Sequence, residues 1–192
     1  MSLPHDPLKT HSELTDGVLL LRLPRSADAP ALTGAVKESL PELRPWMDWA
    51  GEAYDLAAAQ RWLEFAQQGW AHSTAFHFAI TDAATGEYIG NCGIDGLNLK
   101  EHLGNLGYWV RTGRTRQGIA SRAARLAAGF GFDRIALSRL DIVIAAGNTA
   151  SQRAAEKAGA HFGGIRRKPL VVHTDVHAAV VYTLTATDLQ PG

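Results

Sequence analysis

Apolar residues recur along the chain in runs and periods that predict a mixed sheet with helices packed on it. Strand-like runs occupy residues 18–23, 75–80, 88–94, 106–110, 139–145, 161–167 and 178–184. Helical patterns occupy residues 28–40 and 55–69, a stretch that follows a basic turn and ends near 134, and residues 148–159. The order β-α-α-β-β-β-α-β-α-β-β indicates an α/β protein whose helices cover the faces of a mixed sheet.

Polar residues at the ends of these segments predict how several of them begin and end. Asp28 and Asp55 each precede a helical pattern and are suited to capping it. The turn DAATGE at 82–87 separates two strand-like runs, which indicates a hairpin. Gly159 follows the last helical pattern and can end that helix in a left-handed conformation.

Length and composition fit one folded domain, 1–192, with 46% hydrophobic residues and flexible tails expected at about 1–14 and 186–192. No apolar run approaches the ~20 residues that span a membrane, and the N-terminus lacks the apolar core of an export signal. The single cysteine, Cys92, excludes an internal disulfide and suits a reducing cytoplasm. Zero net charge argues against a protein that coats nucleic acid, but it allows a local phosphate site.

One segment breaks the charge balance, because residues 111–132 hold five arginines and no acidic residue. Within it, Gly118 precedes an alanine-rich helical run, and a helix start with a nearby glycine can bind an anion through free N–H groups. The segment fits either a phosphate site, with arginines 114, 116, 122 and 125 at its entrance, or a solvated basic helix behind a flexible turn. The chain contains neither G-x-x-x-x-G-K-[ST] nor G-x-G-x-x-G, so the common nucleotide loops are excluded.

Motifs on both sides of this turn favour the phosphate site. Residues 115–120, TRQGIA, resemble the [QR]-x-x-G-x-[GA] pyrophosphate turn of the GNAT superfamily of N-acetyltransferases, with Thr115 at the first position and Arg114 beside it. Residues 148–159 resemble the segment that follows the fifth strand in that family. LRPWMDWA at 43–50 and LGYWV at 106–110 are similar to the RimJ/RimL-type branch, which acetylates N-termini of ribosomal proteins. The resemblance covers roughly residues 18–184.

The resemblance implies the GNAT fold: about seven strands and about four helices, with the fourth and fifth strands splayed apart. Acetyl-CoA, the implied co-substrate, would lie in that gap, with its pyrophosphate at the turn and its pantetheine arm along the preceding strand. The residues implied for acetyl-CoA binding are Tyr108, Trp109, Val110, Arg114, Arg116, Gln117, Gly118, Ile119, Ala120, Asn148 and Ser151. Asn148 and Ser151 can also be read as a helix N-cap and a solvated helix serine.

The implied chemistry is direct attack of an amine on the thioester carbonyl in a ternary complex. The Val110 backbone N–H is the candidate that stabilises the oxyanion. Many GNAT enzymes protonate the leaving thiolate with a tyrosine at the position that Ala155 occupies here, which leaves Ser151 as the nearest candidate hydroxyl. Four residues are candidates for the general base, although each can equally be a turn, surface or packing residue: Glu87, Asp95, Glu101 and His77.

The resemblance also implies where the acceptor amine binds. The resemblance places Trp46, Asp48 and Trp49 over the acceptor cleft, although the tryptophans can also be core residues and Asp48 can be solvated. The favoured acceptor is a protein N-terminal α-amine, for example of a ribosomal protein, because a pKa of about 8 leaves part of it neutral near pH 7. The alternatives are a small-molecule amine, such as an antibiotic or a polyamine, and a non-catalytic acetyl-CoA-binding module.

Partners follow from the same resemblance and from what the sequence lacks. Members of the RimJ/RimL-type branch are often homodimers, so a homodimer is expected. No membrane or nucleic-acid partner is expected. No metal is expected either, since His173 and His177 are four residues apart in a predicted strand and turn, and no H-E-x-x-H or C-x-x-C occurs.

Overall fold

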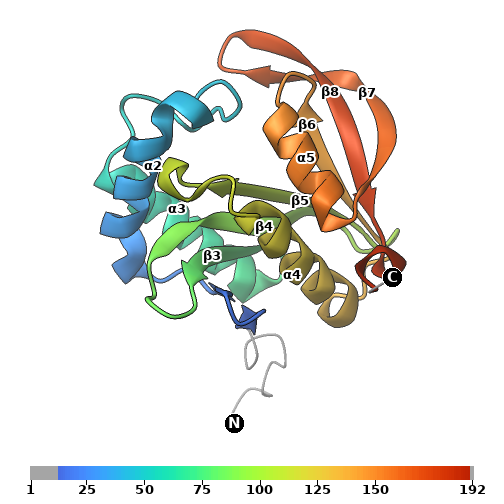
Figure 1. Cartoon of the computed structure of the whole chain (residues 1–192), viewed down its shortest axis with the longest axis horizontal. Coiled ribbons are helices and arrows are strands. Elements are labelled where there is room, and N and C mark those ends of the chain that lie inside the picture. Colours follow the sequence, from blue (N-terminus) through green and yellow to red (C-terminus); the bar gives the residue numbers. More distant parts are fainter. Residues whose placement is uncertain (1–12, 191–192) are drawn as a thin grey trace.

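An eight-stranded sheet with the strand order β1-β2-β3-β4-β5-β6-β8-β7 runs through the protein in the computed structural model, which describes residues 13–190 (Figure 1). Its strands are β1 (Leu14–Thr15), β2 (Leu19–Arg22), β3 (Phe76–Asp82), β4 (Tyr88–Asn98), β5 (Leu103–Val110), β6 (Arg139–Ala145), β7 (His161–Val172) and β8 (Asp175–Leu184). The α-helices are α2 (Ala29–Leu43), α3 (Leu56–His72), α4 (Ile119–Arg134) and α5 (Thr149–Ala158). The predicted mixed α/β fold is confirmed, with β1 as an additional strand.

Local signals in the sequence explain most element boundaries. Asp55 caps α3, because its carboxylate accepts the Ala58 N–H at 2.7 Å, and Gly159 ends α5 at a φ of 100°. The expected cap at Asp28 is wrong. Its carboxylate instead receives the Arg22 guanidinium at 2.7 and 2.8 Å, and this ion pair ties β2 to the start of α2.

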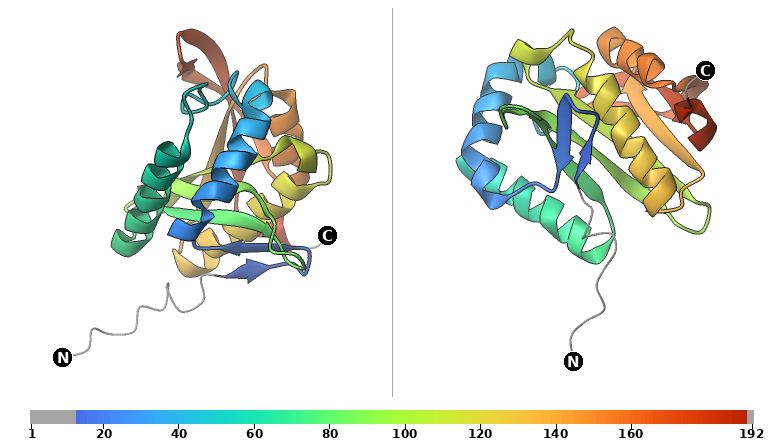
Figure 2. Two further views of the ribbon diagram at one scale, coloured as in Figure 1. Left: turned by 90° about the vertical axis from the view of Figure 1, so that its left-hand side faces the viewer. Right: turned by 60° about the horizontal axis from the view of Figure 1, so that its bottom comes forward.

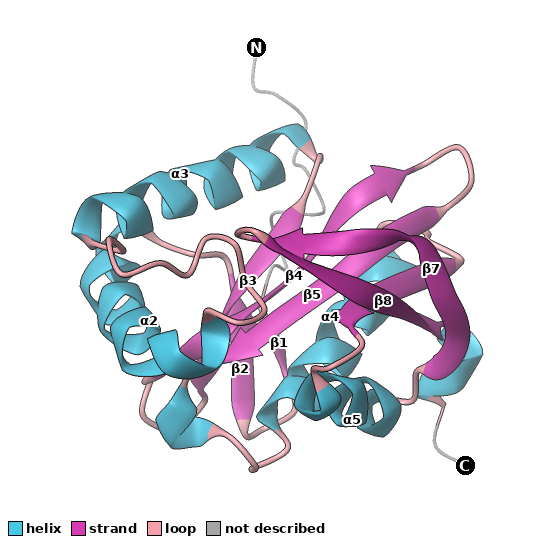
Figure 3. Cartoon of the chain, turned by 90° about the horizontal axis from the view of Figure 1, so that it is seen from above, coloured by secondary structure: helices cyan, strands magenta, loops and turns pink. Residues whose placement is uncertain are grey.

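The helices cover both faces of the sheet (Figures 2 and 3). Helices α4 and α5 pack on one face over the larger apolar core, to which Phe78, Ile94 and Leu106 contribute. Helices α2 and α3 cover the other face over a smaller core that includes Trp109. Because neighbouring residues of a strand point to opposite faces, β5 presents Leu106 and Tyr108 to the α4–α5 side and Gly107 and Trp109 to the α2–α3 side.

The predicted splay of two central strands is present between β5 and β6. These parallel strands pair only at their beginnings, from Leu103 opposite Arg139 to Asn105 opposite Asp141. From residue 106 onwards β5 pairs with β4 alone, so its other edge is open along a V-shaped gap.

The C-terminal residues 186–189, expected as part of a flexible tail, form a short 3-10 helix, η3 (Ala186–Leu189). The Arg125 guanidinium donates to the carbonyl oxygens of Asp188 and Leu189 at 3.4 and 2.7 Å, which anchors this segment to α4. Most of the expected N-terminal tail, residues 1–12, lies outside the described residues. Within residues 13–190, no helix combines the length and hydropathy needed to cross a membrane.

Candidate active site

A cavity of about 280 Å³ occupies the gap between β5 and β6. Its walls are residues 46–49, 105–108, 142–145 and 170–172, together with Asn148 and Ser151. The first group belongs to the loop after α2 on one face of the sheet, and the last two belong to the start of α5 on the other. The cavity therefore passes through the sheet and connects its two faces.

The open edge of β5 offers backbone donors and acceptors to this gap. The Arg111 N–H donates to the Ile89 carbonyl of β4 at 2.8 Å. Because successive N–H groups of a strand point to opposite edges, the polar groups of Tyr108 and Val110 face the gap. The Trp109 carbonyl faces β4 and lies against Gly90, so Trp109 contributes its side chain and not its backbone.

The turn before α4 has the geometry of an anion cradle. Arg116 and Gly118 both adopt left-handed conformations, with φ values of 61° and 74°. No acceptor within residues 13–190 receives the N–H groups of residues 116–121. A Cβ built at Gly118 would meet only Ser121 Oγ, at 3.9 Å, so space is open above the turn. Several free N–H groups at the positive end of a 16-residue helix suit a phosphate group.

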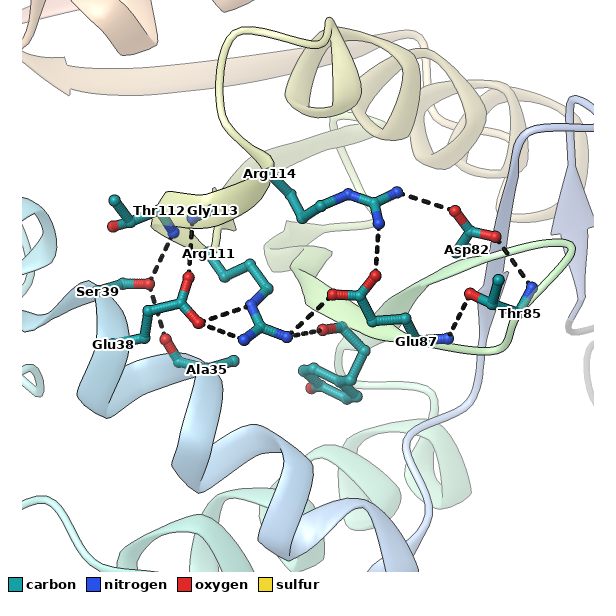
Figure 4. A network of polar contacts seen from close by, with 11 residues as sticks. Ala35, Glu38, Ser39, Asp82, Thr85, Glu87, Arg111, Thr112, Gly113 and Arg114 are labelled. Atoms are coloured by element: carbon teal, nitrogen blue, oxygen red, sulfur yellow. Dashed lines mark hydrogen bonds and ion pairs between the residues drawn. The ribbon is translucent and has the colours of Figure 1, made fainter.

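Most arginines of the basic segment are neutralised within the protein, contrary to the expectation that they crowd the entrance. Arg114 pairs with Asp82 and Glu87, and Arg111 pairs with Glu87 and Glu38 (Figure 4). Arg122 pairs with Asp16 at 2.7 Å, and Arg125 binds backbone carbonyls. Within residues 13–190, Arg116 is the one arginine of the segment whose side chain makes neither an ion pair nor a hydrogen bond.

The acidic partners also fix the approach to the cradle. The pKa of Asp82 falls to about 2, with the hydrogen bond from the Arg114 guanidinium as the main cause. Glu38 accepts the Gly113 N–H at 2.8 Å and Ser39 accepts the Thr112 N–H at 2.9 Å, so α2 holds the chain that enters the turn (Figure 4). The network therefore serves to position the cradle and leaves Arg116 to supply its charge.

The start of α5 brings two hydroxyl groups to the cavity. Asn148 caps the helix, because its side chain accepts the Ser151 N–H at 3.1 Å. The Tyr108 hydroxyl donates to the Ser151 carbonyl at 2.9 Å, and the Ser151 hydroxyl lies 3.5 Å from it. Burial raises the pKa of Tyr108 to about 12, so this phenol stays protonated at neutral pH. Ala155, at the usual tyrosine position, is fully buried against the sheet.

Aromatic residues lie over the other end of the cavity. Trp46 and Trp49 both line it, and the Trp49 ring is 44% exposed and lies 5.8 Å from the Trp109 ring. Both tryptophans lie in the loop that follows α2. Asp48 accepts the backbone N–H of His173, in the turn between β7 and β8, so it closes the loop onto this hairpin. Asp48 also lines the cavity, so its role as a charge for the substrate stays a prediction beside this structural contact.

The candidate general bases lie in different surroundings. Glu87 is held by two arginines, and Glu101 is exposed in the turn between β4 and β5. His77 lies beneath α3, where burial lowers its pKa. Asp95 alone contacts a cavity residue, because Asn105 Nδ2 donates to its Oδ1 at 3.1 Å.

Two further sequence expectations concern reactive groups. Cys92 is buried in β4, and burial raises the pKa of its thiol, as expected for a small apolar strand residue. Within residues 13–190, no three His, Cys, Asp or Glu side chains gather in an arrangement that could hold a metal ion.

This fold, with a splayed parallel pair, an anion cradle at a helix start and a cavity through the sheet, defines an acyl-CoA-dependent acyltransferase. The sequence model described as acetyltransferase (GNAT) domain matches residues 18–161, well over half of the chain. The chain therefore belongs to the GNAT acetyltransferase family and uses acetyl-CoA as its acyl donor.

Individual relatives agree with this assignment. The chain is 28% identical to the uncharacterized protein YkkB of Bacillus subtilis over 123 residues, 62% of this chain and 72% of the relative. A putative ribosomal-protein-serine acetyltransferase from Vibrio cholerae superposes with a TM-score of 0.80 at 25% identity, covering 90% of this chain and 97% of that one. RimJ of Mycobacterium smegmatis, in complex with a CoA disulfide, gives a TM-score of 0.82 at 23% identity, covering 94% and 88%. The likeness is consistent with the RimJ/RimL-type branch.

Two polar groups of the cavity, the Tyr108 hydroxyl and the Asn105 amide, were not predicted from the sequence. Tyr108 was assigned through its backbone, yet its hydroxyl reaches α5 across the gap. Asn105 was not singled out, because an isolated asparagine in a strand carries no motif. Its position opposite Asp95 and one residue before Leu106 of the larger core could have indicated the face on which it lies.

Proposed function

We propose that this acetyltransferase modifies the α-amino group of a peptide or protein N-terminus, with a ribosomal protein as the natural acceptor. The observation that carries the proposal is the cavity that joins the α4–α5 face, where the cofactor cradle lies, to the tryptophan-bearing loop on the other face. Trp46, Trp49 and residues 170–172 line this end of the cavity, and we expect a flexible chain end to enter there more readily than a side chain on a folded surface. The similarity to a ribosomal-protein-serine acetyltransferase supports the same acceptor.

In the proposed reaction, the neutral amine nitrogen attacks the thioester carbonyl carbon of acetyl-CoA. The C–N bond forms, the C–S bond breaks, the nitrogen loses one proton and the CoA sulfur takes one up. An α-amine, with a pKa of about 8, needs less help from a base near neutral pH than a lysine, at about 10.4. The site therefore has to position the amine and stabilise two developing anions.

The gap between β5 and β6 holds hydrogen-bond donors for both developing anions, the oxyanion and the thiolate. The Val110 N–H faces the gap and would stabilise the oxyanion on the carbonyl oxygen. The Ser151 hydroxyl would donate a hydrogen bond to the sulfur as it becomes a thiolate, and the Tyr108 hydroxyl, which has one proton, would do so by releasing the Ser151 carbonyl. A phenol with a pKa of about 12 is a weak acid toward a thiolate whose own pKa is near 8.5, so stabilisation by hydrogen bonding is favoured over full proton transfer.

Release of free CoA thiol with a panel of amines tests the proposal. Peptides that begin with alanine or serine should be acetylated on the α-amine, as located by mass spectrometry. Turnover only with an aminoglycoside or a polyamine, or acetyl groups only on lysine side chains, would refute the proposed acceptor. Binding of acetyl-CoA with no release by any amine would favour a non-catalytic module.

The proposed acceptor places the enzyme in the cytoplasm, and a homodimer is proposed with it. The hairpin of β7 and β8 exposes Ile165 by 76%, Val176 by 68% and Val171 by 55%, an apolar surface that a second copy could cover. Light scattering at micromolar concentration should give twice the mass of the chain, and a monomer would refute the dimer.

A further inference from the structure

A polar pair lies at the end of the cavity where β5 and β6 meet. Asn105 lines the cavity, and its side-chain amide donates to Asp95 Oδ1 at 3.1 Å. Ile94 and Leu106 point into the larger core, so their neighbours Asp95 and Asn105 point to the opposite face, which carries α2, α3 and the tryptophan loop. The carboxylate thus fixes the orientation of the amide from one side.

That orientation leaves an acceptor atom available to a ligand. The Nδ2 group of Asn105 is bound to Asp95, and no donor within residues 13–190 reaches the Oδ1 atom. An amide oxygen on a cavity wall accepts hydrogen bonds from an N–H donor, such as an amine or an ammonium group. The free Oδ1 atom of Asn105 therefore suits the amino group that the enzyme has to acetylate.

The charge around this pair also favours a cation. Asp95 makes no ion pair in the described part of the chain, while Asp141, which lies opposite Asn105 on β6, pairs with Arg139 at 3.1 Å. His77, the other titratable group near Asp95, is kept neutral near pH 7 because burial lowers its pKa. The half-buried Asp95 charge is thus left for the incoming amino group, which arrives partly as ammonium, whose desolvation Asp95 would offset, and which gives up that proton before the neutral amine attacks.

The floor of the cavity next to Asn105 is open. Gly107 is the following residue on the same face, and a Cβ built there would meet no atom within 4 Å. Trp109 comes next on this face, beneath the Trp49 ring. Along β5 the floor therefore changes from a polar end through an open centre to an aromatic end.

We propose that Asn105, held by Asp95, binds the acceptor amino group, and that the space above Gly107 receives the first residue of the acceptor. This inference rests on the proposed N-terminal acetylation and specifies how its substrate is recognised. Asn105 is a binding residue in this scheme, and Asp95 is a positioning residue that also supplies negative charge. The acceptor class is a primary amine on a small, unbranched first residue, because a bulky one would compete with Trp109 and Trp49 for space.

Four variants test the proposal with an alanine-starting peptide as the probe. Asn105→Ala and Asp95→Asn should each raise the KM for the peptide about tenfold or more, the loss expected for a hydrogen bond to a charged group. The KM for acetyl-CoA should stay within about twofold, since the cofactor cradle is untouched. Asp141→Asn, which removes the neighbouring charge without a bond to Asn105, should leave both values unchanged.

The double variant Asp95→Asn, Asn105→Asp separates recognition from folding. The double variant reverses the direction of the hydrogen bond and keeps a negative group at the cavity. Its KM for the peptide should therefore return most of the way to the wild-type value. Unchanged peptide KM in Asn105→Ala, or an equal rise in Asp141→Asn, would overturn the inference. Calorimetric titration of the peptide into the CoA-bound protein reads out binding without turnover, so the subsite is tested even where the proposed reaction fails.

Discussion

The Tyr108 hydroxyl donates a hydrogen bond of 2.9 Å to the carbonyl oxygen of Ser151, across the gap between β5 and the start of α5. The contact joins the strand whose open edge lines the gap to the helix that carries the predicted acid, Ser151. Ala155 occupies the position at which many GNAT enzymes carry a tyrosine, while the Ser151 and Tyr108 hydroxyls lie at the start of the same helix. Under the proposed mechanism these two hydroxyls take over the role of that tyrosine.

Removal of these hydroxyls should lower the rate of transfer more than the binding of acetyl-CoA. Ser151→Ala and Tyr108→Phe should each reduce kcat about tenfold, because a hydrogen bond to a developing thiolate exists mainly in the transition state. Steady-state kinetics with both substrates varied would measure this. Tyr182→Phe is the matched control, since the Tyr182 hydroxyl also reaches α5, at Glu156 Oε1 2.9 Å away, but does not line the cavity. An unchanged kcat in both variants would assign the pair to structure alone.

The raised pKa of Tyr108 predicts how the rate depends on pH. Its pKa rises from 10.0 to about 12 on folding, so the neutral, donating form persists through pH 10 and is lost as pH approaches 12. The contribution of Tyr108 to the free energy of unfolding follows the same direction. It is fully present below pH 10, the pKa in the unfolded chain, and is lost as pH rises to the folded pKa of about 12. The wild-type kcat should therefore show no decline from tyrosine ionisation between pH 8 and about 10. A decline there that disappears in Tyr108→Phe would contradict the assignment.

The cradle before α4 predicts a specific effect of a charge at Gly118. Gly118→Asp should weaken acetyl-CoA binding at least tenfold, because a side chain and a negative charge enter the space for phosphate. Raised salt should also weaken binding to the wild type. Gly17→Asp is the control, because Gly17 has a similar φ of 84° and equally open surroundings in the turn between β1 and β2. Calorimetric titration showing equal affinity in the Gly118 variant would remove the cradle from the cofactor site.

The ion pairs predict that two arginines of the basic segment behave differently. Arg116→Ala should weaken acetyl-CoA binding several-fold, since its charge is not neutralised within residues 13–190. Arg114→Ala should change affinity less but lower the melting temperature by about 2 °C, because Arg114 joins Asp82 to Glu87 in a partly exposed network. Titration and thermal melting of both variants would test this, and a larger loss of affinity in Arg114→Ala would reverse the assignment.

The sequence predicted the fold well because the decisive signals are local. Apolar periodicity, the Asp55 cap and Gly159 each act within a few residues of the element that they define. The partners of Arg114 and Asp48 were not predicted, for the opposite reason. Arg114 meets Asp82 from a distant turn, and Asp48 binds the backbone of a hairpin 125 residues away, so no pattern near either residue reports its partner. The strand β1 was missed because two residues are too few for a period.

The contact between Asp48 and the His173 N–H predicts a role for the tryptophan loop in holding a peptide. Asp48→Ala should free the loop from the hairpin of β7 and β8. Peptide binding would then have to order Trp46 and Trp49, which form the roof of the cavity, and this ordering would weaken the binding. The KM for a peptide should rise about fivefold, while a small amine that does not reach the roof should keep its KM.

Glu52→Ala is the control for the Asp48 experiment, because its carboxylate lies after the same loop, is 83% exposed and pairs only with Arg44 in the described part of the chain. Trp49→Ala should resemble Asp48→Ala in its effect on the peptide, since both weaken the same roof, and should spare acetyl-CoA. An equal rise in the KM for the peptide and for the small amine would indicate that the loop shapes the reaction centre itself. An unchanged KM for both acceptors would show that the peptide enters the cavity away from the tryptophans.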